Sequence, residues 1–343
     1  MTVPSGPDRA VLTAPDEPSA VEMLHDLGCT DGLPVIIPTP ERVDRMALAA
    51  GIDPVLSLGL MGPLPGECTV EKLAACAVMA GCLPDHMPIV VAAARAVIDP
   101  EFDLTEMQAT TFGTTPFVIV NGPVARMCGV ASGFGALGPG FRANATIGRA
   151  LRLAMINIGG GRPGSADMTL LGHGGKFTQC LAEDEAASPW EPLHVSRGFS
   201  PDDSVVTVIG TEAPHSVIHV ADGDDPESPL RWLDTVAGML AAPGTNNANI
   251  GGGAAVVVVT PDQVAELSGA GYDRAKVAEA LAERALTRNG RPAFRTPDDI
   301  LIVAAGGAGL YSFVFPTWCA GPHRNRAVSV AVDVGQACDV PWS

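Results

Sequence analysis

The chain has 343 residues, of which 47% are hydrophobic and only 5% aromatic, and its formal net charge is −17. Such an acidic chain argues against nucleic acid or an anionic membrane surface as its general partner. No apolar run is long enough to cross a bilayer, and the 8 cysteines include no CxxC pair. We therefore expect a cytoplasmic protein with reduced thiols and a core of Ala, Val, Leu and Ile.

The N-terminal part of the chain is expected to begin without regular structure. Residues 1–20 are rich in Pro, Ser and Asp and lack the apolar stretch of a signal peptide, which predicts a disordered lead. Residues 33–37 form a short apolar run that predicts a strand. Because Thr39 can cap a helix and Pro40 suits its first position, this strand is expected to feed a helix that ends near residue 50.

Segments with the periods of strands and helices alternate along the rest of the chain. Strands are predicted at 116–120, 204–209, 255–259 and 299–304, and helices at 70–80, from 84 to 98, from Asn144 or Thr146 to 156, at 230–240 and at 273–286. Thr260 and Pro261 repeat the pattern of Thr39 and Pro40, so the two units can form an internal pair. The alternation predicts an α/β fold of largely parallel or mixed sheets with flanking helices, and related lobes are expected at 21–165 and 166–343.

One long segment reverses the charge of the chain. Residues 107–166 contain no Asp or Glu but carry five arginines, at 126, 142, 149, 152 and 162. Since arginine holds carboxylate or phosphate with two parallel bonds, we expect an anionic substrate here, bound by Arg142 and Arg149 at a helix start formed by Asn144 and Thr146. The alternative is a glycine-rich packing region whose arginines are solvated or paired with distant acids.

Cys82 is the strongest candidate nucleophile. It lies two residues before Pro84, an early helical position, and a thiol at a helix start is expected to have a lowered pKa. His86, or His173 in a polar loop, would then move protons. The alternative is that Cys82 is a buried, inert thiol, as free cysteines often are.

Two glycine-rich loops add candidate substrate contacts. Lys176 follows His173 in the first loop and is expected to bind the anion. Gly307 lies in the second loop, directly after the predicted strand 299–304, where α/β proteins often bind ligands. Structural turns are the alternative. Residues 133–138 match GxGxxG, but Pro139 follows them and no acid appears until residue 167, so no dinucleotide or other cofactor is predicted.

A metal site is the weaker hypothesis for the second half of the chain. Glu212, His215 and His219 are spaced so that the two histidines face one way. The spacing is loose for a closed zinc site, so we expect no tightly bound metal. If a metal were present, these three residues would be its ligands.

Six short motifs together resemble a known bacterial family. They are 31–35 (DGLPV), 69–72 (TVEK), 80–84 (AGCLP), 144–149 (NATIGR), 188–192 (SPWEP) and 305–309 (AGGAG). The chain resembles the long partner or fusion domain of UGSC-type proteins, in which selenocysteine or cysteine precedes Gly-Ser-Cys. The resemblance implies thiol or selenol chemistry in a soluble system. Because this chain has no Cys-Gly-Ser-Cys, a redox pair would have to come from a separate protein, and Leu310 stands where the family suggests a lysine.

These observations lead to three functional hypotheses. The first is a cysteine-dependent enzyme that acts on a small carboxylic acid by sulfur transfer, redox or addition–elimination chemistry. The second is a metal-dependent hydratase or hydrolase. The third is a non-catalytic subunit that presents a substrate to a thiol- or selenol-bearing partner protein. In each case we expect a homo-oligomer.

Overall fold

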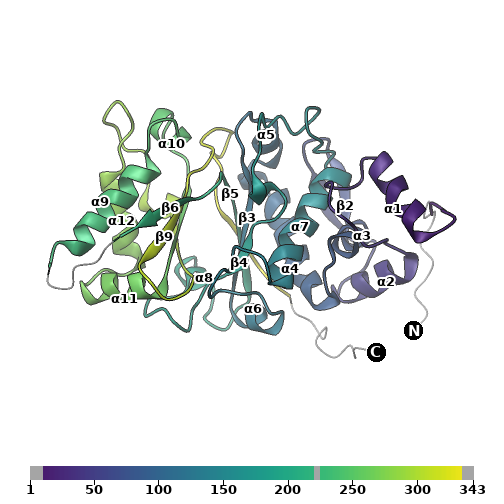
Figure 1. Cartoon of the computed structure of the whole chain (residues 1–343), viewed down its shortest axis with the longest axis horizontal. Coiled ribbons are helices and arrows are strands. Elements are labelled where there is room, and N and C mark those ends of the chain that lie inside the picture. The colour runs from purple at the N-terminus through teal and green to yellow at the C-terminus, as the bar shows by residue number, and fades with distance from the viewer. Residues whose placement is uncertain (1–10, 220–224, 334–343) are drawn as a thin grey trace.

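The computed structural model describes residues 11–219 and 225–333, which form four layers in the order helices, sheet, sheet, helices (Figure 1). The first sheet has the strand order β10-β5-β3-β4, and the second has the order β6-β9-β7-β8. The strands of the first sheet are β3 (Thr115–Asn121), β4 (Cys180–Ala182), β5 (Val205–Thr211) and β10 (Val328–Ala331). Those of the second are β6 (His215–Ile218), β7 (Ala255–Val259), β8 (Ile300–Ala304) and β9 (Tyr311–Phe315). The predicted α/β fold is confirmed, with mixed sheets.

The two sheets repeat one plan. In the first, β3 pairs in parallel with the edge strand β4 and antiparallel with β5, and β10 lies antiparallel beyond β5. In the second, β7 pairs in parallel with β8 and antiparallel with β9, and β6 lies antiparallel beyond β9. The two sheets therefore have the same arrangement of strands.

The outermost antiparallel strands are exchanged between the halves. β6 follows β5 in the chain but pairs with β9 of the other sheet, and β10 follows β9 but pairs with β5. Each half thus completes the sheet of the other. A division of the chain at residue 165 would also separate β3 from β4 and β5, the two strands with which it pairs.

The sheets face each other across an apolar layer. Phe117 and Ile119 of β3 point into it from one side, and Val256 and Val258 of β7 point into it from the other. Phe117 meets Phe315 of β9 with ring centroids 4.9 Å apart. Alternate residues of each strand face opposite sides of its sheet, so both faces of each sheet must be covered, and the runs of valine and isoleucine follow from this.

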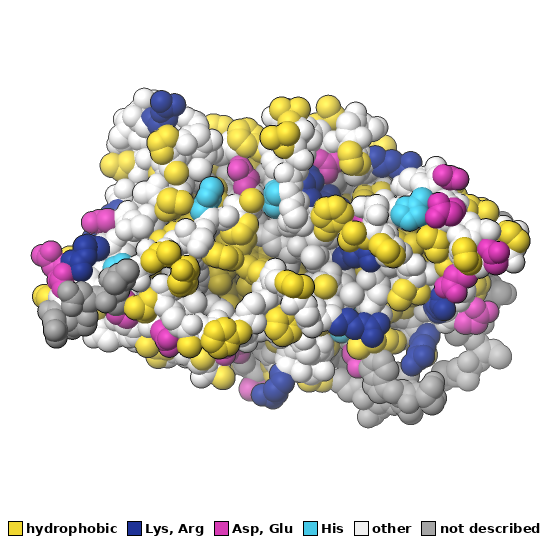
Figure 2. Space-filling view, viewed as in Figure 1, with side chains coloured by type: hydrophobic (Ala, Val, Ile, Leu, Met, Phe, Trp, Pro, Cys, Tyr) yellow, Lys and Arg dark blue, Asp and Glu magenta, His cyan; other side chains and the backbone are white. Residues whose placement is uncertain are grey.

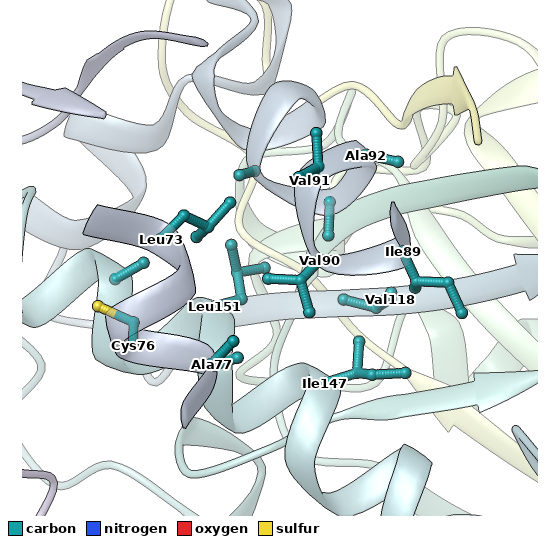
Figure 3. Close-up of a cluster of buried hydrophobic side chains, with 14 of the residues drawn as sticks. Leu73, Cys76, Ala77, Ile89, Val90, Val91, Ala92, Val118, Ile147 and Leu151 are labelled. Carbon is teal, nitrogen blue, oxygen red and sulfur yellow. The ribbon is translucent and has the colours of Figure 1, made fainter. Parts of the chain in front are cut away.

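Helices cover the outer face of the first sheet. Val118 of β3 packs with Ile147 and Leu151 of α7 and with Val90 of α4, and Leu73 of α3 extends this core (Figure 3). All five side chains are at most 1% exposed. Full burial of each contributes about 1.5–3 kcal/mol. The helices of this half are α1 (Glu17–Asp26), α2 (Pro40–Leu48), α3 (Val70–Ala80), α4 (Met87–Ile98), α5 (Leu104–Ala109), α6 (Pro123–Met127) and α7 (Arg142–Asn157). A further short helix, α8 (Leu193–Ser196), contacts β8, and its Leu193 joins the layer between the sheets.

The outer face of the second sheet is covered in the same way. Trp232 of α9 is fully buried there, and its indole N–H donates to Ser312 Oγ of β9 at 3.1 Å. The helices of this half are α9 (Ser228–Leu240), α10 (Asn246–Asn249), α11 (Pro261–Gly269) and α12 (Arg274–Arg284). In the described ranges, no helix has both the length and the apolar character needed to cross a bilayer.

Two local predictions differ from the structure. Residues 33–37 form no strand. Ile36 N donates to Met79 O at 3.3 Å, while the carbonyl oxygens of Leu33 and Pro34 accept from the Arg149 side chain and not from a neighbouring strand. α7 begins at Arg142 with Phe141 as its N-cap, so neither Asn144 nor Thr146 caps it. A small antiparallel pair, β1 (Ser57–Met61) and β2 (Gly66–Thr69), completes the fold, and the disordered lead predicted for residues 1–20 lies partly outside the described residues.

Candidate functional site

Four of the predicted site residues lie together near the start of α7. The Cys82 thiol donates to Thr146 O at 3.3 Å, and His86 Nδ1 lies 3.3 Å from Thr146 Oγ1. Arg142 Nε donates to Gly81 O at 3.0 Å. Cys82 and His86 are 7% and 2% exposed, Thr146 is half-buried and Arg142 is exposed.

The predicted lowering of the Cys82 pKa is wrong. Burial raises the pKa of the Cys82 thiol to about 12, because it penalises the charged form more than the nearby Thr146 and Arg142 favour it. The chain does turn into a short 3-10 helix at Pro84–His86 before α4. The sulfur, however, faces the carbonyl oxygen of Thr146 and not free N–H groups.

We expect Cys82 to resist alkylation in the folded protein. Iodoacetamide at pH 7 should label the half-buried Cys29 well before Cys82, because the reactive thiolate is scarce when the pKa is about 12 and the sulfur is covered. Peptide mass spectrometry of timed samples measures both rates. Labelling of Cys82 first, without denaturant, would contradict this expectation and restore the nucleophile hypothesis.

His86 is expected to make the fold sensitive to acid. Burial, followed by the positive charge of Arg142, lowers the pKa of His86 to about 4. The unfolded chain therefore takes up this proton first, and the stabilisation present above pH ~6.5 is lost as the pH falls towards 4. Between pH 7 and pH 5 this costs about 2 kcal/mol of unfolding free energy. Denaturant titrations at pH 7 and pH 5 should show that His86→Asn loses less unfolding free energy than the native chain. Equal losses would show that His86 does not cause the acid sensitivity.

Two of the predicted anion ligands, Arg149 and Asn144, are already engaged. Arg149 forms a bidentate pair with Asp31, with N–O distances of 2.7 and 2.8 Å, and also donates to Pro34 O. Asn144 is buried and uses both amide atoms on the backbone, accepting from Ala131 N and donating to Ala131 O, Ala136 O and Cys180 O. Arg149 and Asn144 are therefore not free to bind an anion, and the alternative of arginines paired with distant acids holds for Arg149. Arg142 is exposed and forms no ion pair among the described residues, so the anion site stays a prediction.

His173 and Lys176 lie elsewhere, near the start of β3. Lys176 Nζ pairs with Asp167 at 2.8 Å and donates to Thr169 Oγ1. The backbone carbonyl oxygen of Lys176 accepts from Arg152 Nε. His173 Nε2 lies 2.5 Å from Gly113 O, and its Nδ1 accepts from Gly175 N. Burial lowers the pKa of both Lys176 and His173. These contacts hold the loop in place and bring neither residue to Cys82.

The three residues of the metal hypothesis point to different partners. Glu212 accepts from Asn246 Nδ2 at 3.1 Å, and burial raises its pKa. His219 Nε2 meets Ser228 Oγ at 2.9 Å, and the His215 side chain is exposed. No cluster of three or more His, Cys, Asp or Glu side chains suited to a metal ion occurs within 11–219 and 225–333.

A cleft of about 560 Å³ lies between the two sheets. Leu181 of β4 forms one wall, and Ser216 of β6 and Phe313 of β9 form the other. In the space-filling view, hydrophobic side chains line the hollow at the centre of the face (Figure 2). The full lining is Gly135, Ala136, Leu137, Gly138, Leu181, Ser216, Val258, Thr260, Ala305, Gly306, Tyr311, Ser312 and Phe313.

Two loops, residues 133–138 and 305–309, close one end of the cleft, where β7 and β8 end. Phe134 is 72% exposed, yet its ring lies flat against Gly307 of the other loop. A Cβ at position 307 would come within 2.0 Å of that ring, so this close approach requires glycine. The loop that contains Gly307 therefore borders the cleft through Ala305 and Gly306, but Gly307 itself does not line it. A contact between Gly307 and a ligand stays a prediction.

The polar groups of the cleft are few and uncharged. Thr260 Oγ1 is engaged with the backbone of Gly309, and Ser312 Oγ accepts from Trp232. Ser216 and Tyr311 keep hydroxyls with no hydrogen-bond partner elsewhere in the described ranges. No sequence motif marks this site, because its walls come from strands far apart in the chain.

Comparisons with known proteins add no assignment to this geometry. A scan against models of protein families, a search of curated proteins and a search of solved structures each found no match for the chain. The resemblance to UGSC-type partner domains therefore stays a prediction.

Proposed function

We propose that the protein binds a small, uncharged and largely apolar organic molecule in the cleft between the sheets. The observation that carries this proposal is a cleft of about 560 Å³ whose lining contains no charged side chain. Small-molecule sites are typically concave and apolar, with a few polar groups that fix orientation. Ser216 and Tyr311 are those groups here, and a charged ligand would lose its hydration without a partner in return.

The cleft is not an automatic result of the repeated fold. Ser216 pairs with Phe313 of β9, and its counterpart in the other half is Ser329, which pairs with Thr207 of β5. There Arg197 Nε donates to Ser329 Oγ at 2.6 Å, so a charged side chain stands beside the equivalent serine. The uncharged, apolar lining is thus particular to one half, which favours a neutral ligand there.

A binding role fits the lining better than thiol or acid–base chemistry. General acid–base catalysis needs a group that gains and loses protons near neutral pH, and the cleft offers only hydroxyls. The nearest hypothesis from the sequence is the non-catalytic, substrate-presenting subunit. The cysteine-dependent enzyme has less support, because burial raises the Cys82 pKa to about 12.

The 2 tyrosines of the chain give a direct test. Tyr311 lines the cleft, whereas Tyr272 packs against the core of the second half. With carbon-13-labelled tyrosine, NMR should show neutral apolar fragments shifting the Tyr311 signal while Tyr272 stays still. Shifts from carboxylates alone, or no shift across a broad library, would reject the proposal.

A further inference from the structure

A second cleft, of about 380 Å³, lies between the halves and has a different chemistry. Its floor includes Ala254 and Leu301, beside β7 and on β8. Its rim carries three arginines and three acids, contributed by both halves. They are Glu101, Arg197, Arg295, Asp298, Asp299 and Arg326.

Two of these cations are matched by neighbouring acids. Arg295 donates to both carboxylate oxygens of Asp299, with the shorter distance 3.0 Å. Arg326 lies 3.7 Å from Glu101. This leaves one charge of each sign, Arg197 and Asp298, without an ion pair among the described residues.

The geometry of Arg197 leaves half of its guanidinium available. Nε donates to Ser329 Oγ at 2.6 Å and Nη2 donates to Ala327 O at 2.8 Å, both on one side of the group. The edge formed by Nη1 and Nη2 has no partner in the part of the chain that the structure describes. Burial lowers the pKa of Arg197, and the charge of Asp298 raises it, so the two groups act on each other without forming an ion pair.

We propose that this cleft binds a small zwitterion with the chemistry of an α-amino acid. Its carboxylate would meet the free edge of Arg197 with two parallel bonds, as arginine and carboxylate prefer. Its ammonium would face Asp298, whose charge would repel a simple anion. Because the remaining charges cancel in pairs, a ligand with one charge of each sign fits the cleft better than either an anion or a cation. The proposal is independent of the ligand of the apolar cleft.

Calorimetry with three related compounds tests the charge pattern. Leucine carries both charges, 4-methylpentanoate lacks the ammonium, and isoamylamine lacks the carboxylate. We expect leucine to bind at least about tenfold more tightly than either analogue, because each analogue leaves one charge of the cleft unmatched. No binding of leucine, or equal binding of leucine and 4-methylpentanoate, would overturn the proposal.

Variants assign the two contacts. Arg197→Gln should weaken leucine binding roughly 30-fold. Asp298→Asn should remove the preference for leucine over 4-methylpentanoate. Asp298 is exposed, so this variant stays informative even if Arg197→Gln unfolds, which a thermal melt would reveal. Arg126→Gln, an exposed arginine outside the cleft, is the matched control and should bind as the native chain does. Unchanged binding by Arg197→Gln, or a preference that survives Asp298→Asn, would reject the site.

Discussion

Replacing Glu183 by glutamine is expected to destabilise the protein by about 3–5 kcal/mol, because it leaves the Arg274 charge buried without its counterion. Glu183 follows β4 and is 5% exposed, and Arg274 begins α12 and is 7% exposed. Their ion pair joins the two halves. The remaining bonds of Glu183 come from Asn121 Nδ2 at 2.6 Å and Leu193 N at 2.7 Å, so its charge is fully used.

Chemical denaturation of matched variants measures this effect. Glu279→Gln removes an exposed acid from α12 and should change the unfolding free energy by no more than about 0.5 kcal/mol. The double variant Glu183→Gln with Arg274→Met should recover part of the loss, because no unpaired charge remains. If Glu183→Gln behaves like Glu279→Gln, the pair does not hold the halves together.

The largest functional effect should come from filling the apolar cleft. Ser216→Trp places an indole in the space that the ligand needs, and we expect affinity for neutral fragments to fall about 100-fold or more. Ser216 is exposed, so the new side chain displaces no core residue and the melting temperature should change little. The shift of the labelled Tyr311 signal measures binding directly.

Ile218→Trp on the same strand is the control for this substitution. Ile218 is 61% exposed and does not line the cleft. The Ile218→Trp variant should bind the fragments as the native chain does. Equal binding by Ser216→Trp and the native chain would place the ligand elsewhere.

Local signals predicted some elements to the residue. The helix Val70–Ala80 begins after Thr69, whose hydroxyl accepts from Lys72 N, and the strand Ala255–Val259 is a continuous apolar run. Both predictions depend only on residues that are adjacent in the sequence. Residues 33–37 failed the same reasoning, because a short apolar run can be buried by packing without joining a sheet.

The candidate sites were harder to predict, because they depend on distant parts of the chain. The position of Cys82 before a helical turn was visible in the sequence, but its burial under α7 was not. The sequence correctly indicated that Arg149 holds a negative charge, but that charge belongs to Asp31, 118 positions away, and not to a ligand. The cleft uses small and hydroxyl side chains that form no motif, and the four-residue strands β6 and β10 are too short to stand out.

The exchange of edge strands also orders events during synthesis. As the chain leaves the ribosome, β3, β4 and β5 emerge together, but β10 begins only at Val328. Until then the open side of β5 presents unpaired N–H and C=O groups to other nascent chains. Since domains tend to fold as they are made, this protein must keep its first sheet unfinished until nearly all of the second half has been translated. We therefore expect chains halted between residues 220 and 300 to be especially prone to aggregation.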